Sequence, residues 1–360
     1  MDRRAFLAAA AFAGCSLPQP RPDHDGVPDY LAGQRPDFAT DPHGAGMAWF
    51  RSVGLGLHLD YGVHTQLGRG PAAQFEDRIP PADYAKLKRG FDASGFDAPA
   101  IADLAQEAGF RYLGLTVRQP DGFCLFRTTA TDFNALEVTG RDLLAELGEA
   151  CRHRSLGLFV SFSYAADWRH PYFYPAESSQ TEWRGARPAY DSQPPEYRFA
   201  RDEDFQLYVR DVHHQIQEIA YRYRPLAGIR LEPDAGYHAR PDLFPVGQAY
   251  ALIREASPGT LIAFGAGANG EEDFSALSHL RPEPPPTPLA ASVWERNRDK
   301  PREVAVRLNG GERMADGPAQ DPTAPVPKKL LLVAGLQADG SLAPDDQRGI
   351  AEFAAHPEAA

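Results

Sequence analysis

Short apolar runs alternate with amphipathic segments along the chain from about residue 41 onward. Six runs have the length and apolar content of buried strands, at residues 55–59, 112–117, 157–163, 228–232, 261–264 and 329–333. Segments with helical spacing of apolar residues lie between or after them, at residues 98–109, 142–152, 203–223, 244–257 and 344–354. Buried strands that alternate with helices predict a parallel sheet with helices packed on it.

The number of strands and the length of 360 residues favour an α/β fold of the (β/α)8 TIM-like barrel class over an open doubly wound sheet. The Gly265-x-Gly267-x-x-Gly270 spacing after the strand predicted at 261–264 is not followed by a segment with helical spacing, which argues against a dinucleotide-binding fold. Residues 281–327 are rich in proline and charge, and their pattern predicts no element. In such a barrel the chemistry lies where the strands end and in the loops that follow.

The first residues are typical of an export signal. Arg3 and Arg4 precede an apolar run that ends at Cys15, a pattern that resembles a twin-arginine signal followed by a lipoprotein cleavage box. We therefore expect a signal peptide at residues 1–14, lipidation of Cys15, a Pro-rich tether at residues 15–41 and a barrel domain at residues 42–360. The expected location is the periplasm or outer membrane of a bacterium, and an ordinary apolar N-terminal helix is the alternative.

Charge and cysteine content narrow the choice of partners. The formal net charge of −12 argues against nucleic acid, which requires clustered Lys and Arg. Mature membrane contact is expected only through a lipid anchor at Cys15, because no apolar run is long enough to cross a bilayer. The other two cysteines, Cys124 and Cys151, are predicted to be buried thiols, and no Cys/His spacing indicates a metal site.

The fourth predicted strand carries the strongest candidate for chemistry. Arg230 and Glu232 alternate with Ile229 and Leu231, so the two charged residues share the face that points into the barrel. A carboxylate at a strand end is a candidate nucleophile or base, and Arg230 could hold it ionised. The alternative is a buried structural ion pair.

Seven segments, in order, resemble the α-L-fucosidase family, glycoside hydrolase family 29. The resemblance runs from about Met47 to Phe353. Its segments are Trp49-Phe50 with Gly56 and Gly62, Phe96-Asp97-Ala98 with Gly109 and Tyr112, residues 115–123 against the family's LTxKHHDGF, Gly140-Arg141-Asp142, Asp167-Trp168 with Pro171, residues 223–232 against YGP..GIWFD, and residues 330–347 against LLNVGP..DG.

This resemblance implies a barrel enzyme that removes a terminal sugar from glycans with retention and needs no cofactor or metal. Retention uses two carboxyl groups. The family's nucleophile position falls on Glu232, and its acid/base points to Glu271 or Glu272, with Glu295 a weaker candidate. The implied substrate-binding residues are Asp60, Tyr61, Arg118, Gln119, Asp121, Trp168 and Arg230. The chain lacks the β-sandwich that often follows the barrel in this family, so we expect one catalytic domain.

The strand ends depart from the family pattern. Asp60 replaces the histidine of HWG, Gln119 and Pro120 replace the two histidines of KHHDGF, and Glu replaces Asp at the nucleophile position. These histidines bond fucose hydroxyls in the family, and losing such partners costs discrimination. Two hypotheses follow: a retaining glycosidase for another sugar, carboxylated or sulfated if Arg118 and Arg230 reach it, or an inactive carbohydrate-binding relative.

Aromatic residues in the loop after the third predicted strand could stack on a sugar in either case, or pack within the loop. They are Trp168, Tyr172, Phe173, Tyr174 and Trp183.

Overall fold

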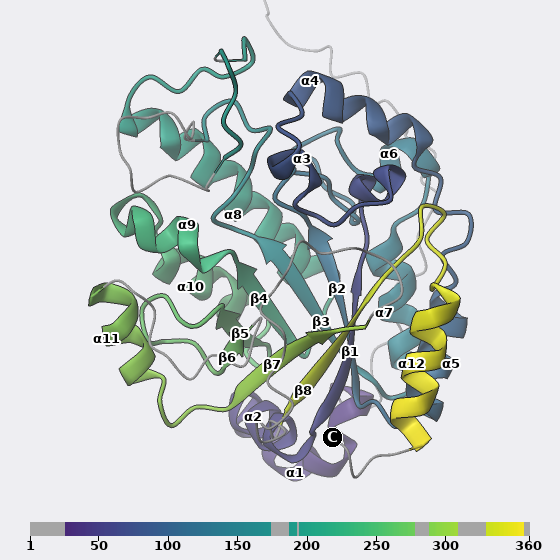
Figure 1. The fold of residues 1–360 in the computed structure, drawn as a ribbon. Helices are drawn as coiled ribbons and strands as arrows, with labels where there is room; N and C mark the ends of the chain where they lie inside the picture. Colours follow the sequence, from purple (N-terminus) through teal and green to yellow (C-terminus); the bar gives the residue numbers. More distant parts are fainter. Residues whose placement is uncertain (1–25, 174–186, 193, 278–287, 309–328, 356–360) are drawn as a thin grey trace, which may run out of the picture.

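The computed structural model describes residues 26–173, 187–192, 194–277, 288–308 and 329–355. Eight parallel strands form one sheet in the order β5-β4-β3-β2-β1-β8-β7-β6, which curls into a nearly closed barrel (Figure 1). The α/β barrel predicted from the sequence is confirmed. In Figure 1 α2 lies below the strands, while α3, α4 and α6 lie above them, where β1 and β2 end.

The eight strands and the helices have the following bounds. The strands are β1 (Leu55–Asp60), β2 (Tyr112–Arg118), β3 (Gly157–Ser163), β4 (Gly228–Glu232), β5 (Leu261–Phe264), β6 (Ser275–Leu277), β7 (Arg302–Arg307) and β8 (Leu330–Gly335). The longer helices are α2 (Pro42–Ser52), α5 (Ala98–Glu107), α7 (Leu143–His153), α8 (Phe205–Arg222), α10 (Val246–Ala256), α11 (Pro288–Arg296) and α12 (Pro344–Ala355). The short helices are α1 (Arg35–Phe38), α3 (Ala73–Glu76), α4 (Pro81–Tyr84), α6 (Ala135–Thr139) and α9 (Asp234–Ala239), with 3-10 turns η1 (Asp29–Gln34), η2 (Val63–Leu67), η3 (Ala85–Gly90), η5 (Asp202–Asp204) and η6 (Pro241–Leu243).

Helix ends follow the local sequence. The carboxylates of Asp97 and Asp142 accept hydrogen bonds from the backbone amides of Ala100 and Ala145, which caps the first turns of α5 and α7. Gly109, just beyond α5, has a φ of 82°, a left-handed conformation that glycine adopts without strain. Each predicted strand and helix is present, and its bounds differ by a few residues at most.

Among the strands and the longer helices, four elements were not predicted, namely α2, β6, α11 and β7. Of these, α11 and β7 lie in the segment at 281–327 that gave no pattern. The reason is visible in β7, where Glu303 and Arg307 point toward the barrel interior and break the apolar run expected of a parallel strand.

Two apolar clusters hold the fold together. The larger one lies between the strands and the helices and includes Leu57, Leu115 and Leu231. The smaller one fills the lower end of the barrel, where Trp49 and Phe50 of α2 pack against inward-facing aromatic rings of the strands. The lower barrel is therefore a packed core, and the polar interior residues lie above it.

The strands at the two ends of the sheet, β5 and β6, are not paired by a continuous ladder of backbone hydrogen bonds. A few hydrogen bonds beside them join the two ends. The Asp273 carboxylate accepts a hydrogen bond from the Ile262 amide at 2.8 Å, and the Asp273 amide donates to the Ile262 carbonyl at 2.7 Å. Asp273 also accepts from His43 of α2 and from Arg254 of α10. The Asp273 side chain therefore connects β5 to α2 below the barrel and to α10 beside it.

The predicted tether at residues 15–41 is wrong in its second half. Residues 29–38 form η1 and α1, and Val27 and Leu31 are buried against α2. The packed domain therefore begins near residue 27, because the apolar side chains of Val27 and Leu31 pack against α2. The predicted signal peptide and Cys15 lie outside the described residues. Among the described residues, no helix is long and apolar enough to cross a membrane.

Candidate active site

Glu232 is the last residue of β4, and its side chain is exposed at the upper end of the barrel. Its backbone carbonyl accepts hydrogen bonds from the amides of Tyr164 and Ala165, at 2.5 and 3.0 Å, so the ends of β3 and β4 are held together. Arg230 shares the inward face of β4 with Glu232 but lies one step deeper and is 1% exposed. The predicted facing of these two residues thus agrees with the structure.

Arg230 forms an ion pair with Glu303 of β7. Its Nε and Nη2 donate to the two carboxylate oxygens of Glu303 at 2.7 and 2.8 Å, a two-point contact in which both side chains are buried. The hydroxyl of Tyr112 donates to the same carboxylate at 2.7 Å, and the guanidinium lies over the Phe159 ring. The charge of Arg230 is therefore satisfied inside the barrel by Glu303, and its role in substrate binding stays a prediction.

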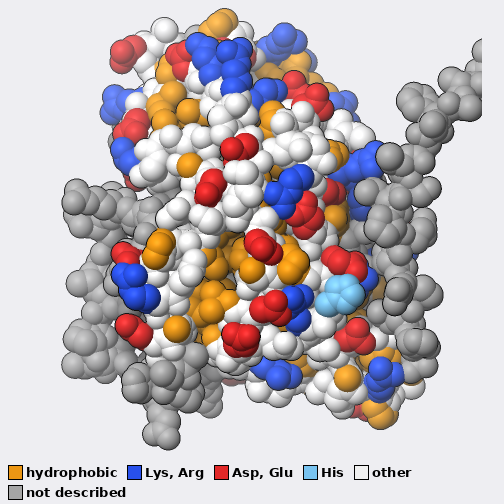
Figure 2. All heavy atoms as spheres, turned by 90° about the vertical axis from the view of Figure 1, so that its right-hand side faces the viewer, with side chains coloured by type: hydrophobic (Ala, Val, Ile, Leu, Met, Phe, Trp, Pro, Cys, Tyr) orange, Lys and Arg blue, Asp and Glu red, His pale blue; other side chains and the backbone are white. Residues whose placement is uncertain are grey.

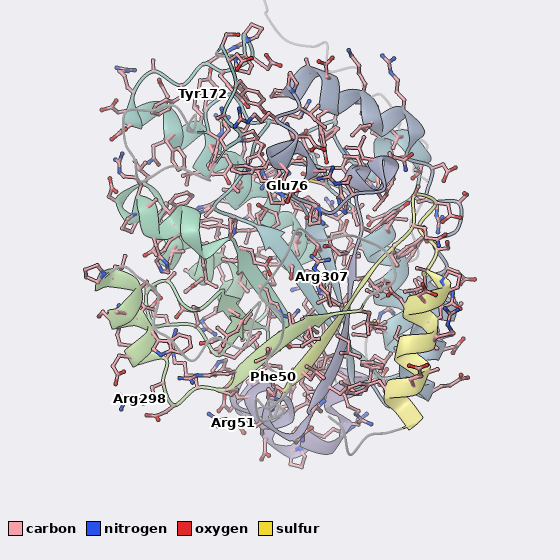
Figure 3. All side chains as sticks on the ribbon, in the orientation of Figure 1. Phe50, Arg51, Glu76, Tyr172, Arg298 and Arg307 are labelled. Carbon is pink, nitrogen blue, oxygen red and sulfur yellow. The ribbon has the colours of Figure 1, made fainter. Side chains whose placement is uncertain are left out.

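A second polar group lies at the ends of β1, β2 and β7. The Asp60 carboxylate accepts from Gln119 Nε2 at 2.6 Å and from Arg307 Nη2 at 2.9 Å. Figure 3 shows Arg307 in the middle of the molecule, with Phe50 below it and Glu76 of α3 above it. The Arg307 side chain is 33% exposed and that of Asp60 is 4% exposed, so Arg307 presents this group to solvent.

The charge of Asp60 is stabilised within this group. Burial opposes ionisation, but the neighbouring Arg307 guanidinium and His64 outweigh it, and the pKa of Asp60 lies below its usual value. Asp60 is therefore an ionised acceptor. Asp60 and Gln119 had been predicted from the sequence, while Arg307 had not, because β7 was not recognised as a strand.

His58 lies below Asp60 on the inward face of β1. Its Nε2 is 2.8 Å from the hydroxyl of Thr116 on β2. Burial, together with the nearby Arg230 charge, lowers the pKa of His58 to about 3. The imidazole is therefore neutral at ordinary pH. The sequence reading missed it because a lone histidine within an apolar run carries no distinctive signal.

Two predicted substrate-binding residues, Tyr61 and Arg118, are buried for structural reasons. The Tyr61 ring packs 4.9 Å from that of Phe91, centroid to centroid, and its hydroxyl donates to the Ala338 carbonyl. Arg118 forms a short ion pair with Asp167 and donates to the Ser163 carbonyl. Both side chains are thus engaged in buried contacts at the ends of β1 and β2, and their roles in substrate binding stay predictions.

Asp121 and Trp168 are also mostly enclosed. Asp121 accepts from the Tyr84 hydroxyl at 2.9 Å and from the Phe123 amide at 2.7 Å, and burial raises its pKa. Asp121 thus organises its own turn, and its role in substrate binding stays a prediction. Trp168 is 6% exposed, with its ring 5.6 Å from that of Phe75.

Among the described residues, the two other aromatic side chains predicted to stack on a sugar, Tyr172 and Phe173, do not form an exposed platform. Phe173 is buried against Phe205 and Tyr208. Tyr172 is partly buried, and Figure 3 places it far from Arg307, toward the outer edge of the molecule. Tyr174 and Trp183 lie outside the described residues.

The loop after β5 separates the two acid/base candidates. Glu272 is buried and accepts hydrogen bonds from five donors at 2.7–3.0 Å, which are the amides of Ala268, Asn269 and Gly270, the side-chain amide of Asn297 and the hydroxyl of Tyr250. Burial raises its pKa, but these donors outweigh burial and hold it below its usual value. Glu272 therefore supports the loop, and its contacts favour a structural role over the predicted acid/base role.

Glu271 is exposed, with one carboxylate oxygen 3.0 Å from the side-chain nitrogen of Asn269. Glu295 is exposed on α11 and pairs with Arg298. Of the two acid/base candidates in the loop, Glu271 alone is exposed, and its backbone carbonyl accepts a hydrogen bond from Arg254 of α10. Among the described residues, no group of three or more His, Cys, Asp and Glu side chains could hold a metal ion.

Sequence comparison identifies the family of this barrel. The sequence model described as alpha-L-fucosidase matches residues 39–264, which is more than half of the chain. The chain belongs to the α-L-fucosidase family. Within the family, human tissue alpha-L-fucosidase is 32% identical over 146 residues, covering 35% of this chain and 31% of the human protein. The rat tissue enzyme is 29% identical over 188 residues, covering 47% and 37%. The alignments therefore span about a third of these relatives' length.

Solved α-L-fucosidase structures share the fold. The unliganded α-L-fucosidase AlfC from Lactobacillus casei superposes with a TM-score of 0.65 at 22% identity, covering 87% of this chain and 98% of that one. Isoenzyme 1 from Paenibacillus thiaminolyticus gives a TM-score of 0.68 at 23% identity, with 88% and 76% coverage. A variant of AlfC was solved in complex with Fuca(1,6)GlcNAc, at a TM-score of 0.65 and 23% identity, covering 87% and 98%. At this identity the likeness concerns the fold.

Proposed function

We propose that the protein is a retaining glycoside hydrolase that removes a terminal sugar other than fucose from a glycan. The observation that carries the proposal is the placement of Glu232, an exposed carboxylate at the end of β4 in a family barrel. Strand ends at this face carry the chemistry in such barrels.

In the proposed mechanism Glu232 attacks the anomeric carbon while Glu271 gives its proton to the leaving oxygen. The bond from the carbon to that oxygen breaks, and a covalent glycosyl ester forms on Glu232. Glu271 then takes a proton from water, and the resulting hydroxide equivalent displaces the ester and regenerates the Glu232 carboxylate. This requires the two carboxyl groups to approach within about 5–5.5 Å when the sugar is bound.

The proposed substrate is a neutral sugar. Arg118 and Arg230 were the basis for expecting a carboxylated or sulfated glycan, and both are buried against acidic partners. Asp60 and Arg307 supply an acceptor and a donor side by side near the end of the barrel, a pairing that suits adjacent hydroxyl groups. Nucleic acid is not a proposed partner, since basic and acidic side chains are interspersed over most of the face in Figure 2.

The proposed location is the periplasm or outer membrane, with Cys15 as the lipid anchor. This rests on the Arg3-Arg4 signal pattern and the small residues before Cys15. Expression in a bacterium with labelled fatty acid tests it. We expect label in the wild-type protein and none in Cys15→Ala, and an unlabelled wild-type protein would contradict the proposal.

A panel of aryl α- and β-glycosides tests the function. We expect turnover of at least one neutral glycoside, weak or no turnover of the α-L-fucoside, and loss of turnover in Glu232→Gln. Turnover that survives this substitution would overturn the mechanism. Strong turnover of the α-L-fucoside would contradict the proposal that the sugar is not fucose. It would show that fucose is bound without the family histidines that this chain lacks.

A second function, sugar binding without hydrolysis, is favoured by one specific observation. The inward polar side chains bond to one another, as in the Asp60, Gln119 and Arg307 group, and Glu272 is enclosed by its own loop. Glycan-array binding without turnover of the same glycans would support this function over the first.

A further inference from the structure

Arg187 lies between β3 and α8, and its side chain is buried, with 1% exposed. Its Nη2 donates hydrogen bonds to the backbone carbonyls of Asp167 and His170, at 3.3 and 2.9 Å. The guanidinium carbon lies 3.6 Å from the centre of the Tyr197 ring, which covers one face of the group. The contacts of Arg187 are therefore made with neutral groups.

Three of the five N–H bonds of this guanidinium have no acceptor among the described residues. They belong to Nε and Nη1, which are both enclosed and make no hydrogen bond there. A buried donor without an acceptor is costly in free energy, and more so when it is charged. In a folded protein such a group commonly marks a bound water or ion.

The carboxylate nearest in charge to Arg187 is already occupied. Asp167 is the acidic side chain among the principal electrostatic neighbours of Arg187. One of its oxygens forms a buried ion pair with Arg118, and the other accepts hydrogen bonds from the amides of Arg169 and His170, at 2.9 and 2.8 Å. Two buried guanidinium groups thus share one carboxylate.

The other principal neighbours of Arg187 are phenol groups. Burial raises the pKa of Tyr190, Tyr197 and Tyr208, so all three are neutral at ordinary pH. Burial also lowers the pKa of Arg187, to about 10, which leaves the guanidinium cationic at pH 7. The surroundings of Arg187 therefore combine a positive charge with aromatic and uncharged polar groups.

We infer that Arg187 binds a small monovalent anion, a halide such as chloride, through Nε or Nη1. A halide supplies both the acceptor and the negative charge that the described neighbours do not supply. A divalent oxyanion such as sulfate is a poorer fit, because the cost of taking an ion out of water grows with the square of its charge. The inference does not depend on the proposed function of Glu232.

An anion at Arg187 acts on the loop that follows β3. Arg187 holds the carbonyls of Asp167 and His170, and the Tyr197 hydroxyl donates to the carbonyl of Trp168. Fixing the guanidinium therefore also fixes the backbone on either side of Trp168. The site would make the order of this loop depend on halide concentration.

Chlorine-35 NMR of the full-length protein tests the site, because chloride that exchanges with a protein site gives a broadened line. In the wild type we expect an excess line width that bromide displaces and that sulfate at equal ionic strength does not. Arg187→Met removes the cation and should abolish the displaceable part. Arg298→Met removes an exposed guanidinium instead, and is the matched control that should keep it.

Bromide-soaked crystals of the wild type provide a second test that needs no variant. We expect an anomalous peak within hydrogen-bond distance of Nε or Nη1 of Arg187. A water or no density at that position would overturn the inference, as would a displaceable line width that is absent from the wild type or unchanged in folded Arg187→Met. If Arg187→Met does not fold, the crystals decide. Neither measurement uses a glycoside, so failure of the proposed function leaves both intact.

Discussion

Arg307 at the end of β7 donates to the Asp60 carboxylate at the end of β1 over 2.9 Å, and β8 lies between the two strands. The contact therefore spans one whole strand at the upper end of the barrel. The histidine of the family's HWG motif corresponds to Asp60 here, and Arg307 provides the positive partner that an ionised aspartate requires at this depth.

We predict that Arg307→Met destabilises the protein by about 2 kcal/mol at pH 7, because it leaves a nearly buried carboxylate with one partner fewer. The folded-state pKa of Asp60 is lowered. The stabilisation is thus present above the usual aspartate pKa and is lost as the pH falls through the folded-state pKa. Urea unfolding at pH 7 and pH 3 measures this difference. Arg298→Met, which removes an exposed pair, is the control and should change stability by less than about 0.5 kcal/mol.

Glu272→Gln should destabilise the protein by about 2–4 kcal/mol, because the amide cannot accept from all five donors that surround the carboxylate. Glu271→Gln, one position earlier and exposed, is the matched control and should be nearly neutral in stability. Thermal unfolding of the two variants checks the prediction. Equal stability of the two variants would show that the loop is supported in another way.

The lowered pKa of the buried His58 leads us to predict that the protein loses stability in mild acid. Its folded-state pKa is about 3, so between the usual histidine pKa near 6.5 and pH 3 the unfolded chain binds a proton that the folded protein does not. Stability should fall by up to about 1.4 kcal/mol per pH unit over that window from this residue. His58→Gln keeps a donor for Thr116 and should flatten the dependence. Denaturation curves from pH 7 to pH 4 provide the measurement, and parallel curves for both proteins would refute the assignment.

The sequence identified six of the eight strands from their apolar runs, and it placed Glu232 and Asp60 correctly at strand ends. It failed at β7, because a strand that carries Glu303 and Arg307 into a barrel does not read as a buried apolar run. That failure hid the partners of Arg230 and Asp60, and so Arg230 looked available to a substrate.

The acid/base pair shows a second limit. Glu271 and Glu272 are adjacent, and no pattern separates an exposed carboxylate from one enclosed by its own backbone. The difference arises from the loop turning its amides inward around Glu272, assisted by Asn297 from the end of α11, 25 residues away. Contacts of this kind depend on the three-dimensional path of the chain.

Asp273 has a consequence for the motions of the barrel. Where other neighbouring strands share a ladder, β5 and the segment before β6 are held by this carboxylate and a few backbone bonds. Because few bonds close the barrel at this seam, we expect local opening to begin there. Amide hydrogen exchange should accordingly be faster along residues 261–264 than along 112–118 in the middle of the sheet, and Asp273→Asn should widen the gap.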